Sequence, residues 1–250
     1  MLVLFKMIYD AHAHLDYFNE DELNEIVSAP NVNLIISNST NLQSCKKNLK
    51  LSQQYEKIKL AAGLYPEENL KLSDLTKLKK FIQKNKSEVI AIGEIGMDFS
   101  HPLPDKKLQE KIFKEQLKLA KELNVPAIIH TRKAEKEVIE ILEKHKDQKI
   151  ILHFFHANFK LIKKAEELGF YFNIPTNIVK SQHFQKMVKE LPKDKILTET
   201  DAPYLSPHER KKNQPAFIKE SIKIIVKIWN TTEKKVEKQI EDNFNKLFKT

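Results

Sequence analysis

Two histidines separated by a single residue, His12 and His14, are the first side chains along the chain whose types and spacing could bind a metal ion. They follow an apolar run over residues 1–9, interrupted only by Lys6, that predicts a buried first strand. Side chains two residues apart in a strand point to the same face, so both imidazoles would lie side by side where the strand ends. We interpret the pair as half of a metal site, because imidazole nitrogen is a common metal ligand. The alternative is that two core or surface histidines fall near each other by chance.

The elements that would position such a site follow from an alternation of short apolar runs with amphipathic stretches along the whole chain. Prolines fall at the junctions between these stretches, which supports the division. The apolar runs predict further strands over 34–38, 60–64, 89–95, 127–130, 150–153, 170–174 and 196–200. The amphipathic stretches predict helices over 20–28, 42–57, 73–85, 105–123, 134–145, 159–168, 180–191, 215–229 and 232–248.

Eight strand and helix units in 250 residues predict a single α/β domain over 1–250, with the architecture of a (β/α)8 TIM-like barrel. A doubly wound open sheet is the competing architecture, and the chain has no Gly-x-Gly-x-x-Gly turn to support it. In a barrel of this kind the active site lies at the C-terminal ends of the strands. Six potential metal ligands fall at those ends, and their convergence favours a metal centre: His12, His14, Glu94, His130, His153 and Asp201.

The two arginines point to the same end of the barrel. Nearly all the positive charge comes from lysine, yet Arg132 and Arg210 both lie in loops directly after predicted strands. A guanidinium offers a planar fork of donors that binds phosphate or carboxylate in a way an ammonium cannot. We therefore interpret both as candidate substrate-binding residues.

Composition and net charge limit which binding partners and which cellular compartment are plausible. The net charge of +9 makes an anionic partner plausible, although lysine and glutamate spread over helical patterns are also explained as solvated helix faces. A lone cysteine, Cys45, excludes an intramolecular disulfide and favours the cytoplasm. The N-terminal apolar run is too short for a membrane span. We expect a monomer that does not bind membranes.

With these residues in hand, the chain resembles the TatD family of metal-dependent deoxyribonucleases, within the amidohydrolase-like barrels. The likeness keeps the order of the family's motifs from Asp10 into the final third of the chain. The matching segments are 10–15 (DAHAHL), 92–98 (IGEIGMD), 129–132 (IHTR), 151–153 (ILH), 199–205 (ETDAPYL) and 213–216 (NQPA).

The resemblance implies a two-metal site with Mg, Mn or Zn, in which Glu94 bridges the ions. His12, His14 and Asp201 would hold one ion, and His130 and His153 would hold the other. A water made acidic by the metals would give its proton to Asp201, so Asp201 and Glu94 would be the catalytic residues for phosphodiester hydrolysis. Arg132 and Arg210 would neutralise phosphate charge. Two further carboxylates have open roles: Glu199 either orients a ligand or is an internal ion-paired residue, and Asp98 either positions substrate or caps a loop.

Two departures from the family pattern put substrate preference and rate in doubt. The family usually carries Gly-x-His-Pro after the third strand, whereas this chain has Tyr65 at the histidine position. A tyrosine can donate a hydrogen bond to a phosphate but cannot act as an imidazolium. A Ser-Gly pair that normally follows the sixth strand is replaced by His156 and Ala157. We include Tyr65 and His156 among the candidate substrate-binding residues.

The sequence therefore predicts a metal-dependent hydrolase that cleaves DNA, with exonuclease character, and three rivals stay open. The first is an ester or amide hydrolase on the same scaffold, such as an aminoacyl-tRNA deacylase. The second is a PHP-type phosphoesterase, which also opens with His-x-His and which a seven-unit barrel would favour. The third is a barrel that binds nucleic acid without cutting it.

Overall fold

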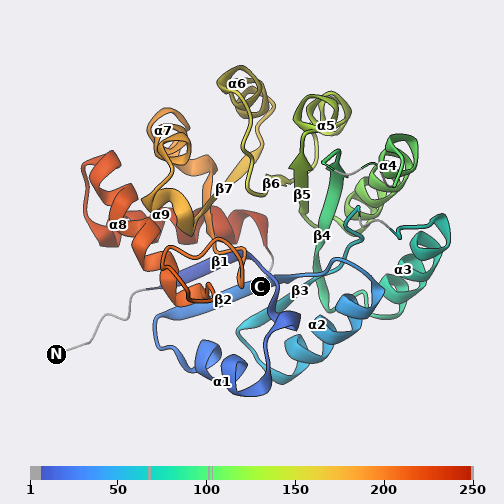
Figure 1. Cartoon of the computed structure of the whole chain (residues 1–250), viewed down its shortest axis with the longest axis horizontal. Coiled ribbons are helices and arrows are strands. Elements are labelled where there is room, and N and C mark those ends of the chain that lie inside the picture. Colours follow the sequence, from blue (N-terminus) through green and yellow to red (C-terminus); the bar gives the residue numbers. More distant parts are fainter. Residues whose placement is uncertain (1–6, 67–68, 101, 103, 249–250) are drawn as a thin grey trace.

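The computed structural model describes residues 7–66, 69–100, 102 and 104–248, and its eight strands form one parallel sheet in the order β1 to β8. The strands are β1 (Ile8–Ala13), β2 (Val32–Asn38), β3 (Ile58–Ala61), β4 (Val89–Asp98), β5 (Ala127–Arg132), β6 (Ile150–Leu152), β7 (Tyr171–Pro175) and β8 (Ile196–Glu199). A doubly wound sheet would reverse its strand order at a switch point. The sequential order instead confirms the predicted (β/α)8 barrel, and Figure 1 shows its strands ringed by helices.

The helices alternate with the strands and cover the outside of the barrel (Figure 1). Their N-termini are specified locally: Asn19 and Glu22, for example, form a reciprocal capping box at the first helix. They are α1 (Glu20–Ser28), α2 (Leu42–Gln54), α3 (Leu72–Lys84), α4 (Lys106–Leu123), α5 (Glu135–Leu142), α6 (Phe159–Glu167), α7 (Gln182–Glu190), α8 (Ile218–Trp229) and α9 (Glu233–Leu247). Short 3-10 turns, η1 (Leu15–Tyr17) to η5 (Pro215–Phe217), occupy several of the connections.

The seam between β1 and β8 closes the barrel through hydrogen bonds that also fix the backbone of candidate metal ligands. Asp201 N donates to His12 O at 2.9 Å, and His14 N donates to Ala202 O at 2.7 Å. The buried Asp10 carboxylate accepts bonds from the backbone and hydroxyl of Thr200 at 3.0 and 2.5 Å. Burial raises the pKa of Asp10 to about 7, although the bonds from Thr200 oppose that rise. The first and last strands are thus locked together beside the histidine pair.

The first strand is displaced from its predicted position. Within the described residues β1 begins at Ile8 and runs through Ala13, so His12 lies inside the strand and His14 follows it. The prediction over 1–9 falls mostly on residues 1–6, which lie outside the described residues. The strand continues past Tyr9 because all of its residues, including the polar Asp10 and His12, are buried, as is typical of a parallel strand covered on both faces.

Glu94 is positioned by a strand that runs close to its neighbours. A Cβ at Gly93 would lie 2.7 Å from Asn38 Oδ1 and 2.8 Å from Ile128 Cβ. A Cβ at Gly96, where φ is +149°, would lie 2.0 Å from the backbone oxygen of His130. Only glycine fits such approaches, so the glycines on either side of Glu94 let β4 bring its carboxylate between the histidines of other strands.

Candidate metal centre

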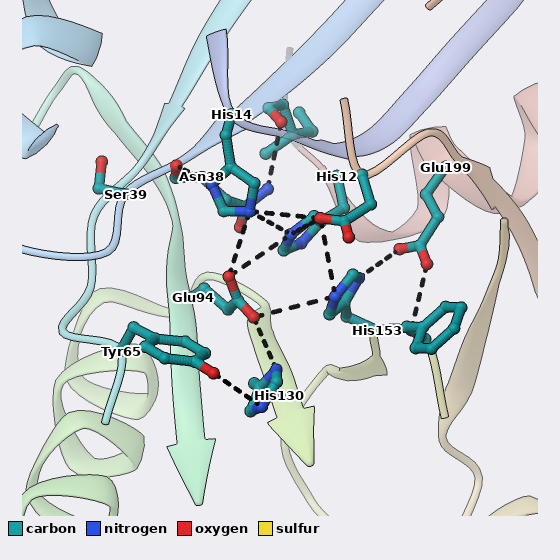
Figure 2. A network of polar contacts seen from close by, with 12 residues as sticks. His12, His14, Asn38, Ser39, Tyr65, Glu94, His130, His153 and Glu199 are labelled. Carbon is teal, nitrogen blue, oxygen red and sulfur yellow. Dashed lines mark hydrogen bonds and ion pairs between the residues drawn. The ribbon is translucent and has the colours of Figure 1, made fainter. Parts of the chain in front are cut away.

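Glu94 lies at the middle of the site, and its two carboxylate oxygens face different histidines (Figure 2). Its Oε2 lies 3.6 Å from His12 Nε2 and 3.3 Å from His14 Nε2. Its Oε1 lies 2.9 Å from His130 Nδ1 and 3.8 Å from His153 Nε2. We refer to His12, His14 and Asp201 as the β1–β8 side, and to His130 and His153 as the β5–β6 side.

The β1–β8 side, taken with Glu94, brings its potential ligand atoms to the spacing expected around a single ion. Asp201 Oδ1 lies 3.4 Å from His12 Nε2 and 3.3 Å from His14 Nε2, and the two nitrogens are 3.2 Å apart. With the Glu94 distances, five separations among four ligand atoms lie between 3.2 and 3.6 Å. Nitrogen and oxygen ligands roughly 2.0–2.1 Å from a tetrahedral ion are about 3.3–3.4 Å apart. The residues present therefore fit a divalent ion.

The β5–β6 side offers three atoms at looser spacing. Glu94 Oε1, His130 and His153 each present one ligand atom within 4.8 Å of the others. The His130 side chain is 14% exposed, close to the 15% of Asp201, whereas the other three histidines are 0–5% exposed. Three protein ligands with an accessible face are the pattern of a site that keeps a position for water or substrate.

Other groups fix the orientation of two of the rings. His14 Nδ1 lies 3.1 Å from Asn38 O, and His153 Nδ1 lies 2.8 Å from Glu199 Oε2. Glu199 Oε1 also accepts a bond from Phe154 N at 3.1 Å. A ligand histidine that donates one ring N–H to such a partner presents its other nitrogen to the ion. Glu199 therefore contacts a candidate metal ligand, His153, as its first predicted role requires. Its other predicted role, an internal ion pair, would need a lysine or arginine partner.

The electrostatics of the site keep its two candidate ligand carboxylates ionised. Burial raises the pKa of the Glu94 carboxyl, but contacts with His130 and His14 outweigh burial and hold the pKa well below its usual value. Burial also raises the pKa of Asp201, but its hydrogen bonds with His12 and His14 outweigh burial and lower that pKa below its usual value. For His153, burial lowers the pKa, yet Glu199 and Asp201 raise it to about 9. Both carboxylates thus stay ionised at neutral pH.

Asp201 points into the site from a left-handed backbone conformation. Its φ is +58°, a region that non-glycine residues seldom adopt and that aspartate tolerates better than most. The bond from its N–H to His12 O holds this turn in place. Its side chain is 15% exposed, compared with 4% for Glu94, so solvent reaches Asp201 more readily.

A cavity of about 630 Å³ opens above the metal centre. Two of the predicted substrate-binding residues line it, Arg132 at the end of β5 and Tyr65 after β3. The Tyr65 hydroxyl donates to Asp98 Oδ2 at 2.8 Å and lies 3.3 Å from His130 Nε2. Asp98 also accepts bonds from the backbone and hydroxyl of Ser100, so it both caps its loop and supports this cluster. The hydroxyl proton of Tyr65 is therefore already used within the protein.

The other two predicted substrate-binding residues are not among the described residues that line this cavity. His156 is exposed, and its ring packs against His183 of α7 with centroids 4.1 Å apart. Arg210 is exposed in the loop that follows β8. His156 follows Phe154, whose φ of +40° turns the chain after β6.

Sequence reasoning did not assign five other residues that line the cavity. Several are aromatic or apolar and sit in loops directly after strands, which is the signal that could have identified them. They are Tyr17, Thr40, Phe154, Tyr204 and Leu205.

Comparison with known proteins identifies the family. The family model described as TatD related DNase matches residues 9–249. The chain belongs to the TatD family. It is 35% identical over 246 residues to an uncharacterized metal-dependent hydrolase of Methanocaldococcus jannaschii, covering 96% of each chain. It is 30% identical over 258 residues to the Homo sapiens deoxyribonuclease TATDN3, covering 96% of this chain and 94% of that protein. The protein is thus a TatD-family metal-dependent hydrolase.

The fold agrees with this membership. The crystal structure of YjjV, a TatD homologue from Escherichia coli K12, superposes with a TM-score of 0.88 at 24% identity, covering 96% of this chain and 97% of that one. Eight strands and TatD membership leave the PHP-type alternative, which a seven-unit barrel would have favoured, without support. Within the described residues, no helix combines the length and apolar character that a membrane span requires.

Proposed function

We propose that this TatD-family hydrolase cleaves phosphodiester bonds of DNA from a strand end, using two divalent ions. The observation that carries the proposal is the placement of Glu94, which turns one carboxylate oxygen toward each side of the site. A carboxylate shared in this way is typical of two-metal centres in nucleases and phosphatases. His12, His14 and Asp201 would hold one ion, and His130 and His153 would hold the other.

When bound, the two ions would make a water more acidic and would offset the charge of the phosphodiester. Asp201, as the more exposed carboxylate, accepts the proton that the attacking water loses. The water oxygen forms a bond to phosphorus, and the bond to the leaving nucleoside oxygen breaks. Arg132, at the edge of the cavity, binds a phosphate oxygen with its planar donors.

Three further observations support DNA as the substrate and the cytoplasm as the compartment. The printed name of TATDN3 describes that relative as a deoxyribonuclease, which supports DNA over other phosphodiesters. The net charge of +9 suits a polyanionic partner. Cys45 is buried and free, as expected for a protein of the reducing cytoplasm. We propose that the chain acts there as a monomer.

The decisive experiment uses end-labelled single-stranded and duplex DNA with chelator-treated protein to which Mg, Mn or Zn is added back. We expect nucleotide release that depends on metal and is absent in the Asp201→Ala variant. No cleavage by protein that holds two ions per chain would contradict the proposal and favour ester or amide substrates such as aminoacyl-tRNA. Tight, salt-sensitive DNA binding with no turnover would favour the non-catalytic alternative.

A further inference from the structure

Two tyrosines lie side by side at the rim of the cavity and have no role in the metal chemistry. Tyr17 ends η1, just after β1, and Tyr204 follows β8. Their ring centroids are 6.2 Å apart with the planes at 68°, and the side chains are 50% and 52% exposed. We call them the tyrosine pair. Among described residues, the large hydrophobic side chains left exposed are this pair, Met7 and Leu72.

Backbone hydrogen bonds tie the tyrosine pair to the metal-site residues. Tyr204 N donates to Asp201 O at 2.8 Å, and Tyr17 N donates to His14 O at 3.3 Å. The ring centroids of Tyr17 and Tyr204 also lie 6.0 and 6.3 Å from that of His14. The backbone of each tyrosine is therefore tied directly to a residue of the β1–β8 side.

Away from the tyrosine pair, the cavity is lined by charged and candidate metal-binding groups. Arg132 is the one lysine or arginine among the described residues that line it, and it comes from β5. The metal-site residues His14, Glu94, His130, His153 and Asp201 line the same cavity. It thus combines an aromatic surface, a metal centre and a guanidinium, and its volume of about 630 Å³ lies in the range of small-ligand sites. A nucleotide, with its flat base and charged phosphate, has the matching groups.

We propose that the tyrosine pair stacks one nucleobase next to the phosphodiester that is cut, so that the site accepts a nucleotide only after its base has left the duplex stack. This inference rests on the proposed function. Aromatic rings stack on any base, and loss of such a contact weakens binding by roughly tenfold to a hundredfold. A base inside a duplex must first unpair and unstack to reach the rings. The pair therefore makes the hydrolase selective for single-stranded or frayed ends without selecting a sequence.

A fluorescence measurement tests the stacking directly. Single strands carrying 2-aminopurine at the 3′ or the 5′ end are mixed with the metal-loaded protein, because stacking on an aromatic ring quenches this base. We expect quenching at one end with the wild-type protein and with Tyr17→Phe and Tyr204→Phe, which keep the rings. We expect it to be lost in the Tyr17→Ala/Tyr204→Ala variant. Equal quenching in that double variant, with equal affinity, would overturn the proposal.

A kinetic cycle separates stacking from a general effect on the site. The terminal nucleotide is either normal or replaced by a tetrahydrofuran residue that lacks a base. For the wild-type protein, we expect loss of the base to lower kcat/KM by roughly tenfold or more, mainly through KM, and to matter little in the double alanine variant. If base loss has the same effect in both proteins, the tyrosine pair does not bind the base.

Control measurements distinguish a failure of the stacking proposal from a failure of the nuclease proposal. Met7→Ala removes an exposed apolar side chain just before β1, at the end of the strand away from the cavity, and should change neither readout. Metal content measured for each variant shows whether the ion sites are intact. Tyrosine-dependent quenching without cleavage would retain the stacking site and reject the nuclease. Cleavage with no dependence on the tyrosines would reject the stacking site and retain the nuclease.

Discussion

The two sides of Glu94 hold their ligand atoms with different degrees of constraint. On the β1–β8 side, each histidine nitrogen lies within 3.6 Å of the other and of an oxygen of Glu94 and of Asp201, and hydrogen bonds across the barrel seam fix the backbone of His14 and Asp201. On the β5–β6 side, among the described residues, Glu94, His130 and His153 each present one ligand atom within 4.8 Å of the others, and His130 lines the cavity. The first arrangement is suited to keeping an ion, and the second to leaving positions that water and substrate oxygens can take.

This difference teaches that the two sides of a candidate metal centre can be held in place by different means. The closure of the barrel brings β1 and β8 together, so the ligands at that seam are part of the structure that completes the fold. The β5–β6 side instead relies on side-chain partners, with Glu199 behind His153 and Tyr65 and Asp98 beside His130. We expect the two sides to differ in metal affinity and in their response to mutation.

Removing Glu94 should have the largest effect, because its carboxylate belongs to both sides. For Glu94→Ala we expect activity to fall by at least roughly a thousandfold, with metal content reduced at both positions and the fold intact. Turnover, metal content by elemental analysis and circular dichroism measure the three properties. Normal turnover after this change would refute the bridging assignment.

Removing one ligand from each side tests the comparison itself. Asp201→Ala should lose the ion of the β1–β8 side and abolish activity, since the proton acceptor goes with it. His153→Ala should lose mainly the other ion and leave about one per chain, with the β1–β8 side still filled. Titration of chelator-treated wild-type protein should show two affinities that differ by at least about tenfold. If both variants lose both ions equally, the two sides are not separable.

Glu199 should have a smaller effect, because it acts through His153 as a positioning residue. We expect Glu199→Gln to weaken binding of the β5–β6 ion or to lower activity by about tenfold to a hundredfold. The β1–β8 side should keep its affinity, which metal titration would reveal. As a matched control, Glu190→Gln changes a surface carboxylate at the end of α7 and should behave as wild type. Equal weakening of both ions would contradict a role confined to His153.

Tyr65 should have the smallest effect, because it supports His130 without being a proposed ligand. We expect Tyr65→Phe, which removes the bond to Asp98, to lower kcat by a few fold, of the order of one neutral hydrogen bond. Tyr65→His should change rate or substrate preference with metal content unchanged. A change of metal content in either variant would instead place Tyr65 within the ion-binding set.

The order of strands and helices was largely predictable from local sequence patterns. The ends of the predicted strands then identified the candidate metal ligands. The helix over 20–28 was predicted with its observed bounds, because the Asn19 and Glu22 capping box and the apolar spacing are local properties. The six candidate ligands could be proposed to converge because parallel strands of a barrel all end at one mouth. Their grouping in space agrees with that expectation.

By itself, the sequence determined the barrel and the residue types that meet at its mouth, since periodicity and strand ends are encoded along the chain. Only the tertiary structure decided which atoms face each other. The division of the Glu94 oxygens, the pairing of Glu199 with His153 and the meeting of Tyr17 with Tyr204 join residues far apart in sequence. Side-chain direction in loops depends on backbone angles that the pattern of residues does not specify. The positive φ of Asp201 aims its carboxylate at the other candidate metal ligands, and such a turn cannot be derived from residue type alone.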